Sequence, residues 1–231
     1  MDSAALVVVR VRVWLDDRPG ALGQIAGRIG AVRGDVVGIE ILERGGGSAI
    51  DELVVSLPDT VTLPTLIAEI GRVDGVAVED VRPIDADRPD ASIAALQISV
   101  ALVETSSSSR LEKFCDELLH LVDGAWVVAM RVGGDGELAD LGSLVERGTP
   151  PDRAWLGAFL VGSRHLGADV QGESTPSDVV WVHLEPWGIA VASGRTGRPF
   201  HARERQQIAL LGRVAAGLLS SDARVAPRAA G

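Results

Sequence analysis

The sequence predicts an α+β fold made of two domains, and three observations carry the prediction. Stretches with apolar residues at every second position alternate with stretches in which they recur every three or four positions, the periods of strands and helices. The chain has 231 residues, more than the roughly 100–150 of a typical domain. A polar segment with one proline, residues 84–91, separates two parts that are each apolar enough to form a core, so we interpret it as a linker.

The first predicted domain covers residues 5–83. Its expected elements are a strand over 7–15, a helix over 22–32, strands over 35–43 and 49–57, a helix from about Pro64, and a strand over 76–81 that ends before Pro83. Gly34 is placed to cap the first helix, and the glycine-rich segment 44–48 predicts a hairpin between the two middle strands. The order βαββαβ is that of the ferredoxin-like fold.

The second predicted domain covers residues 92–220 and is followed by a flexible tail, 221–231. Its expected elements are helices over 93–103 and 111–122, strands over 126–132 and 137–145, a helix opened by Pro150-Pro151-Asp152, strands over 179–184 and 188–193, and a long helix over 201–219. Ser109 is a candidate N-cap, and Gly133-Gly134-Asp135-Gly136 predicts a hairpin. The strands of this domain are expected to form an antiparallel sheet.

Composition narrows the possible partners and compartment. A net charge of −10 and a pI near 4.9, with no visible cluster of basic residues, argue against a nucleic-acid-binding surface. The start Met1-Asp2-Ser3 is acidic where a secretory signal would be basic, and no apolar run approaches the ~18 residues of a membrane span. We therefore expect a soluble cytoplasmic protein. The lone cysteine, Cys115, is interpreted as a small core residue rather than a reactive thiol.

The best candidate site is the turn that joins the first strand to the first helix. Free backbone N–H groups at such a turn can hold an anion, a proline at the start of a helix loses no needed hydrogen bond, and a glycine leaves room for a ligand. The candidate ligand-binding residues are Asp16, Asp17, Arg18, Pro19, Gly20, Ala21 and Leu22.

The motif Asp17-Arg18-Pro19-Gly20-Ala21-Leu22, within a βαββαβ frame over residues 6–83, resembles an ACT domain. The resemblance implies a regulatory module that pairs through its sheets and binds an amino acid where the first strand meets the first helix. The ligand carboxylate would then dock on the N–H groups of Gly20, Ala21 and Leu22, and Asp17 or Asp16 would accept the ammonium.

Other interpretations of the turn remain open. Asp17 is also placed to cap the helix, and Arg18 to pair with a neighbouring carboxylate. Leu15 and Val36 stand where the best ligand-binding ACT domains have polar side chains, which favours a hydrophobic ligand or none. The glycines of the first helix, Gly23, Gly27 and Gly30, each cost ~1 kcal/mol of helix propensity, and we expect them to pack closely against the sheet.

The second domain, with Gly197-Arg198-Pro199-Phe200 before its long last helix, resembles a GAF-like sensor domain. The resemblance implies small-molecule binding between sheet and helices, or dimerisation through outer helices. Its tryptophans predict either a pocket for a flat ligand or an aromatic part of the core, and the core is favoured; they are Trp126, Trp155, Trp181 and Trp187. His165, Asp169 and His183 match no established zinc spacing, so no metal site is expected.

The common catalytic motifs are absent from the sequence, and the chance pairing of Ser193 with His183 is a weak argument for hydrolysis. We therefore expect a non-enzymatic regulatory protein without a cofactor. It would bind a small metabolite, with an amino acid as the first candidate, and signal as a homodimer to a protein partner. The alternative is a ligand-free scaffold for dimerisation and protein interaction.

Overall fold

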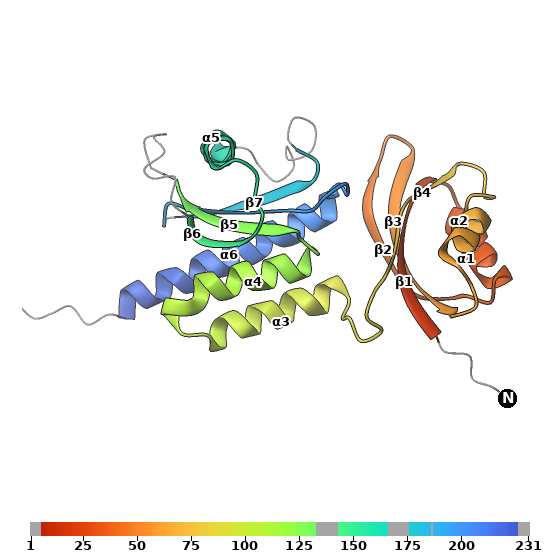
Figure 1. The fold of residues 1–231 in the computed structure, drawn as a ribbon, viewed down its shortest axis with the longest axis horizontal. Helices are drawn as coiled ribbons and strands as arrows, with labels where there is room; N and C mark the ends of the chain where they lie inside the picture. Colours follow the sequence, from red (N-terminus) through yellow and green to blue (C-terminus); the bar gives the residue numbers. More distant parts are fainter. Residues whose placement is uncertain (1–5, 133–142, 166–175, 186, 226–231) are drawn as a thin grey trace, which may run out of the picture. The chain divides into compact units, whose positions relative to one another are not determined.

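The computed structural model describes residues 6–132, 143–165, 176–185 and 187–225 (Figure 1). The chain divides into two units, residues 1–90 and 91–231, which are treated separately below. The expected strand at 137–145 falls partly, and the hairpin signal at 133–136 wholly, outside the described residues, as does Asp169.

The amino-terminal unit has the predicted βαββαβ order. Its elements are β1 (Leu6–Asp16), α1 (Ala21–Ala31), β2 (Asp35–Gly45), β3 (Ser48–Pro58), α2 (Leu63–Ile70) and β4 (Val76–Pro83). The four strands form one antiparallel sheet in the order β2-β3-β1-β4, and both helices cover the same face of it (Figure 1). This topology confirms the ferredoxin-like fold predicted from the element order.

Alternation along β1 explains how this unit forms its core. Val9, Val11, Val13 and Leu15 point to the helix-covered face and are fully or almost fully buried. They pack with apolar residues of the two helices, namely Ile25, Ile29, Leu66 and Ile70. Gly46 and Gly47 have φ of 61° and 83°, the left-handed pair that closes a two-residue hairpin with the twist of its strands.

Two predictions about glycines are corrected. The left-handed residue after α1 is Arg33, with φ of 62°, and not Gly34. Gly34 is instead needed for close packing, because a Cβ there would lie 2.7 Å from Leu57 Cδ2. A Cβ at Gly23, Gly27 or Gly30 would meet no atom within 4 Å, so these exposed glycines do not pack against the sheet within the chain.

The carboxy-terminal unit contains a second antiparallel sheet. Its elements are α3 (Ala91–Glu104), a 3₁₀ turn (Ser107–Ser109), α4 (Arg110–Leu121), β5 (Trp126–Arg131), β6 (Ser143–Gly148), α5 (Arg153–Gly162), a 3₁₀ turn (Ser163–His165), β7 (Val179–Leu184), β8 (Ile189–Gly194) and α6 (Ala202–Val225). The strand order is β6-β5-β8-β7. The helices α3, α4 and α6 lie on one side of this sheet and α5 on the other, with an apolar cluster on each side (Figure 1).

The predictions about helix ends and about the lone cysteine of this unit are confirmed in part. Asp152 caps α5, since its carboxylate accepts the Trp155 N–H at 2.9 Å. Ser109 occupies the N-cap position of α4, but its side chain makes no capping hydrogen bond. The last helix continues to Val225, so the tail predicted from residue 221 begins too early. Cys115 is buried in the helix-side core, as predicted, and burial raises the pKa of its thiol to about 12.

Candidate small-molecule site of the amino-terminal unit

The predicted turn is built as a sharp corner between β1 and α1. Gly20 is the N-cap residue of α1 and has φ of 87°, a conformation that L side chains rarely adopt. A Cβ at Gly20 would have no atom within 4 Å, so backbone conformation and not space selects glycine here. The corner directs the chain from the sheet into the helix within four residues, Asp17 to Gly20.

The backbone amides of the turn are only partly available to a ligand. The Arg18 N–H donates to the Asp16 carbonyl at 2.8 Å, and the Ala21 N–H donates to the Arg18 carbonyl at 3.3 Å. Leu22 lies in the first helical turn, where an amide has no partner within the helix. Of the three amides predicted to hold a carboxylate, that of Ala21 is therefore already used inside the turn.

The two adjacent aspartates diverge, as expected from strand geometry. The Asp16 carboxylate occupies the space that a Cβ on Gly75 would fill, and its backbone N–H donates to the Gly75 carbonyl at 3.3 Å. Asp17 turns towards Arg44, with 3.7 Å between Oδ1 and the guanidinium nitrogen. No side chain caps α1, so the prediction that Asp17 is its cap is wrong.

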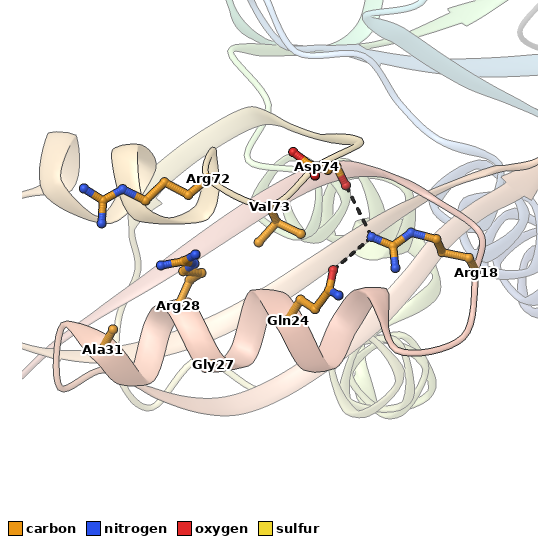
Figure 2. Close-up of a pocket in the computed structure, with 8 residues that line it drawn as sticks. All are labelled: Arg18, Gln24, Gly27, Arg28, Ala31, Arg72, Val73 and Asp74. Carbon is orange, nitrogen blue, oxygen red and sulfur yellow. Dashed lines mark hydrogen bonds between the residues drawn. The ribbon is translucent and has the colours of Figure 1, made fainter.

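Arg18 connects the turn to a groove beside α1 (Figure 2). One of its guanidinium nitrogens donates to the Gln24 side-chain oxygen at 2.9 Å and to the Asp74 backbone carbonyl at 3.5 Å. These acceptors are uncharged, which corrects the prediction that Arg18 pairs with a carboxylate. The groove has a volume of about 480 Å³ and lies between α1 and the segment that follows α2. Its lining consists of Arg18, Gln24, Gly27, Arg28, Ala31, Arg72, Val73 and Asp74.

The groove is a local concentration of positive charge in an acidic chain. Arg28 and Arg72 both form ion pairs with Glu69. Arg28 Nη1 lies 3.8 Å from Glu69 Oε2 and Arg72 Nη1 lies 2.6 Å from Glu69 Oε1, so the two guanidinium groups share one carboxylate. Figure 2 shows Arg28 rising from α1 and Arg72 coming from the chain after α2. Guanidinium groups bind carboxylates and phosphates through paired N–H donors, so the groove is suited to a small anion.

Only part of the predicted site takes part in this groove. Arg18 belongs to both, whereas the other six predicted residues do not line it. The groove residues of α1 and of the segment after α2 were missed because their neighbourhood depends on how two separate elements pack. The sequence predicts that Gln24 and Arg28 lie one turn apart on the same side of the helix, but it does not predict that Arg72 lies near them.

Asp51 is a second residue that the motif did not indicate. It lies on β3 opposite Val13 of β1, is 2% exposed, and its buried Oδ1 has no hydrogen-bond partner. Burial raises the pKa of Asp51, the charge of Arg44 opposes this rise, and the charge of Asp17 adds to it. The sequence does contain a signal for this residue. On the same face of β3 the other positions are apolar, Ala49, Leu53 and Val55, so an acidic residue at position 51 is out of pattern.

Among the described residues of the carboxy-terminal unit, the predicted candidates are divided between the two sides of the sheet. Trp126 and Trp181 belong to the cluster on the α5 side of the sheet, whereas Trp187 packs against the cluster on the opposite side. Ser193 is fully buried, and its hydroxyl donates to the Trp126 carbonyl at 2.8 Å. Within the described ranges, no group of three or more His, Cys, Asp or Glu side chains is arranged to hold a metal ion. The helices that are described include none with the length and apolar character to cross a membrane.

Comparison with known proteins finds solved structures that are similar at low identity and low TM-score. No protein-family model matches the chain, and no curated protein matches it. The ACT domain of the GTP pyrophosphokinase of Chlorobium tepidum is similar at 22% identity with a TM-score of 0.28, over 35% of this chain and 100% of that one. The carboxy-terminal domain of the MgtC protein of Mycobacterium tuberculosis is similar at 19% identity with a TM-score of 0.30, over 39% of this chain and 99% of that one. An unknown protein from Galdieria sulphuraria covers 60% of this chain and 76% of its own, at 12% identity and a TM-score of 0.32.

Proposed function

We propose that the amino-terminal unit is a non-enzymatic regulatory domain of the ACT type that binds a small carboxylate-bearing metabolite, with an amino acid as the first candidate. The observation that carries this proposal is the placement of Arg18, which leaves the β1–α1 turn and enters a groove with Arg28 and Arg72. The ACT-like motif and the ferredoxin-like topology support it. The signal would pass through a dimer to a protein partner.

The chemistry of the groove supports binding of a zwitterion. A ligand carboxylate in the groove would form charge-assisted hydrogen bonds with a guanidinium group of its lining, which includes Arg18, Arg28 and Arg72. Asp74, also in the lining, offers a carboxylate for an ammonium group, and Val73 and Ala31 offer apolar contact. This proposal differs from the hypothesis based on the sequence in two ways. The ligand carboxylate binds arginine side chains instead of the backbone amides of residues 20–22. The ligand ammonium binds Asp74 instead of Asp16 or Asp17.

Regulation requires that the ligand distinguish two arrangements of the protein, because a ligand shifts an equilibrium only by its differential affinity for the two states. The groove joins residues of α1 to the segment after α2, so a bound anion would link these two elements. A change in their spacing is the movement that a dimer partner would sense.

The experiment is a thermal-shift screen of the full chain against the twenty amino acids, with acetate and inorganic phosphate as simple anion probes. A ligand that binds only the folded state raises the free energy of unfolding by ~2.7 kcal/mol at a hundredfold excess over Kd. The proposal predicts a saturable shift that is lost in Arg18→Ala. The matched control is Arg131→Ala, which removes an exposed arginine of the other unit. A shift that both variants retain would contradict this site.

One observation favours a second function, the ligand-free scaffold. Val37 and Ile39 on the edge strand β2 are 58% and 54% exposed. Apolar side chains on an exposed sheet edge suit contact with another protein chain. No response to any compound in the screen, together with a stable dimer, would favour the scaffold over the sensor.

A further inference from the structure

The charged side chains of the groove beside α1 form two groups, one at each end (Figure 2). At one end lies Arg18, which donates to the backbone carbonyl of Asp74 at 3.5 Å. At the other end lie Arg28 and Arg72, which share the carboxylate of Glu69. Each end therefore presents guanidinium groups of its own.

The two ends are separated by about one turn of α1. Gln24, whose side-chain oxygen accepts from Arg18, precedes Arg28 by four residues, a rise of about 6 Å along the helix axis. The lining between them is open, because a Cβ added at Gly27 would meet no atom within 4 Å, and the facing segment contributes the apolar Val73. A short carbon chain with a charged group at each end has room to lie here.

Both ends keep polar groups that a ligand can use. Arg18 makes its two hydrogen bonds through Nη2, and within the described residues the other N–H donors of its guanidinium form no contact. The side chains of Arg28 and Arg72 are 43% and 62% exposed, so their guanidinium groups remain accessible beside Glu69. The Asp74 carboxylate forms no ion pair in the part of the chain that the structure describes, which leaves it available to an ammonium group.

The groove as a whole carries a net positive charge. Its lining contains three guanidinium groups and one carboxylate, that of Asp74, and Glu69 adds a second carboxylate through its ion pairs. One positive charge is therefore left uncompensated. A neutral zwitterion does not change this, whereas an amino acid with an acidic side chain carries one net negative charge at neutral pH and neutralises it.

We propose that the groove binds an acidic amino acid, with glutamate as the ligand of best length. This inference rests on the proposed function and deepens it by naming the side chain of the amino acid. The ligand α-carboxylate binds Arg18, and its ammonium binds the carboxylate of Asp74. The ligand side-chain carboxylate binds Arg28 and Arg72 at the other end. The two carboxylate carbons of glutamate are four bonds, or about 5 Å, apart, which suits the helical turn between the two ends.

Isothermal titration calorimetry of the full chain with L-glutamate and L-glutamine tests this assignment, because the two ligands share one shape and differ in the second carboxylate. Glutamate should bind about 10-fold more tightly than glutamine, the difference that one charge-assisted hydrogen bond makes. Glutarate keeps both carboxylates but lacks the ammonium, so it should bind more weakly than glutamate.

Two variants locate the second carboxylate. Arg28→Gln and Arg72→Gln should each remove the preference for glutamate and leave the affinity for glutamine unchanged, and the retained glutamine binding shows that the variants fold. The matched control is Arg131→Gln, which removes the same charge from an exposed position of the other unit and should keep the preference.

The possible failures are distinct. Equal affinities for glutamate and glutamine in the wild type, or a preference that survives in both variants, would overturn the acidic ligand and leave the proposed amino-acid site standing. Glutarate that binds as tightly as glutamate would overturn the assignment to an amino acid, because the ammonium would then contribute nothing. A chain that binds no amino acid at all would overturn the proposed function and this inference together.

Discussion

Replacement of Gly27 by alanine should stabilise the amino-terminal unit. Gly27 lies in the middle of α1, is exposed, has helical backbone geometry, and a Cβ there would meet no atom within 4 Å. Glycine costs about 0.8–1 kcal/mol relative to alanine at an interior helix position, and this cost is recovered when no clash offsets it. We therefore expect the free energy of unfolding to rise by about 1 kcal/mol.

Urea denaturation followed by far-UV circular dichroism measures this change, with Gly30→Ala as the matched control. Gly30 lies on the same helix, is also exposed, and a Cβ added there would likewise meet no atom within 4 Å, so it should behave alike. Destabilisation by either alanine would refute the reasoning, because it would mean that α1 is in close contact with something that the isolated chain does not include.

Three further predictions follow from particular contacts. Asp51→Asn should raise stability at neutral pH by about 1 kcal/mol, because it removes the charge of a buried carboxylate whose Oδ1 has no hydrogen-bond partner. Burial raises the pKa of Asp51 above its ordinary value of 3.8. The stability contributed by its protonation is therefore fully present below pH 3.8 and is lost as the pH rises through the folded-state pKa. Urea denaturation at several pH values should show this loss in the wild type and not in Asp51→Asn. Asp152→Ala should lower the free energy of unfolding by about 1 kcal/mol, because the Trp155 N–H loses its hydrogen-bond acceptor at the start of α5. An unchanged urea denaturation curve would contradict this capping role. Cys115, with its pKa raised to about 12, should react with a thiol reagent only after denaturation, and rapid labelling of the folded protein would oppose its assignment to the core.

The sequence predicted the fold of the amino-terminal unit because its signals are local. Alternation along β1 is set by burial of one face, and the left-handed pair Gly46-Gly47 fixes the hairpin whatever surrounds it. The end of α1 was misplaced by one residue because Arg33 adopts the left-handed conformation normally given to glycine. Gly34 was still required, but for contact with Leu57, which is distant in sequence.

The site was less predictable because its parts come from separate elements. Sequence reasoning reached Arg18, but the groove also needs Arg72, which packing of the segment after α2 brings near α1. Likewise, a helix over residues 93–103 was predicted, but the burial of Ile98 and Leu102 depends on the packing of α4 and α6 against it. Helix propensity does not show what surrounds a glycine. Gly27 was therefore expected to pack against the sheet, whereas in the structure it lines the groove.

The structure also changes the choice of a blocking variant. Judged from the sequence, Gly20→Val is a simple steric block, but φ of 87° makes any side chain there strained, so loss of binding and loss of folding would coincide. Gly27→Leu is the sharper probe, because leucine has good helix propensity and its side chain would occupy the groove lining. Gly30→Leu is its control on the same helix, outside that lining.

The most direct test of the central claim is the amino-acid screen on these two leucine variants, with melting temperature as the readout. If the groove binds a carboxylate-bearing metabolite, Gly30→Leu will keep the concentration-dependent shift of the wild type, whereas Gly27→Leu will fold and lose the shift. Equal shifts in both variants would contradict the groove as the site.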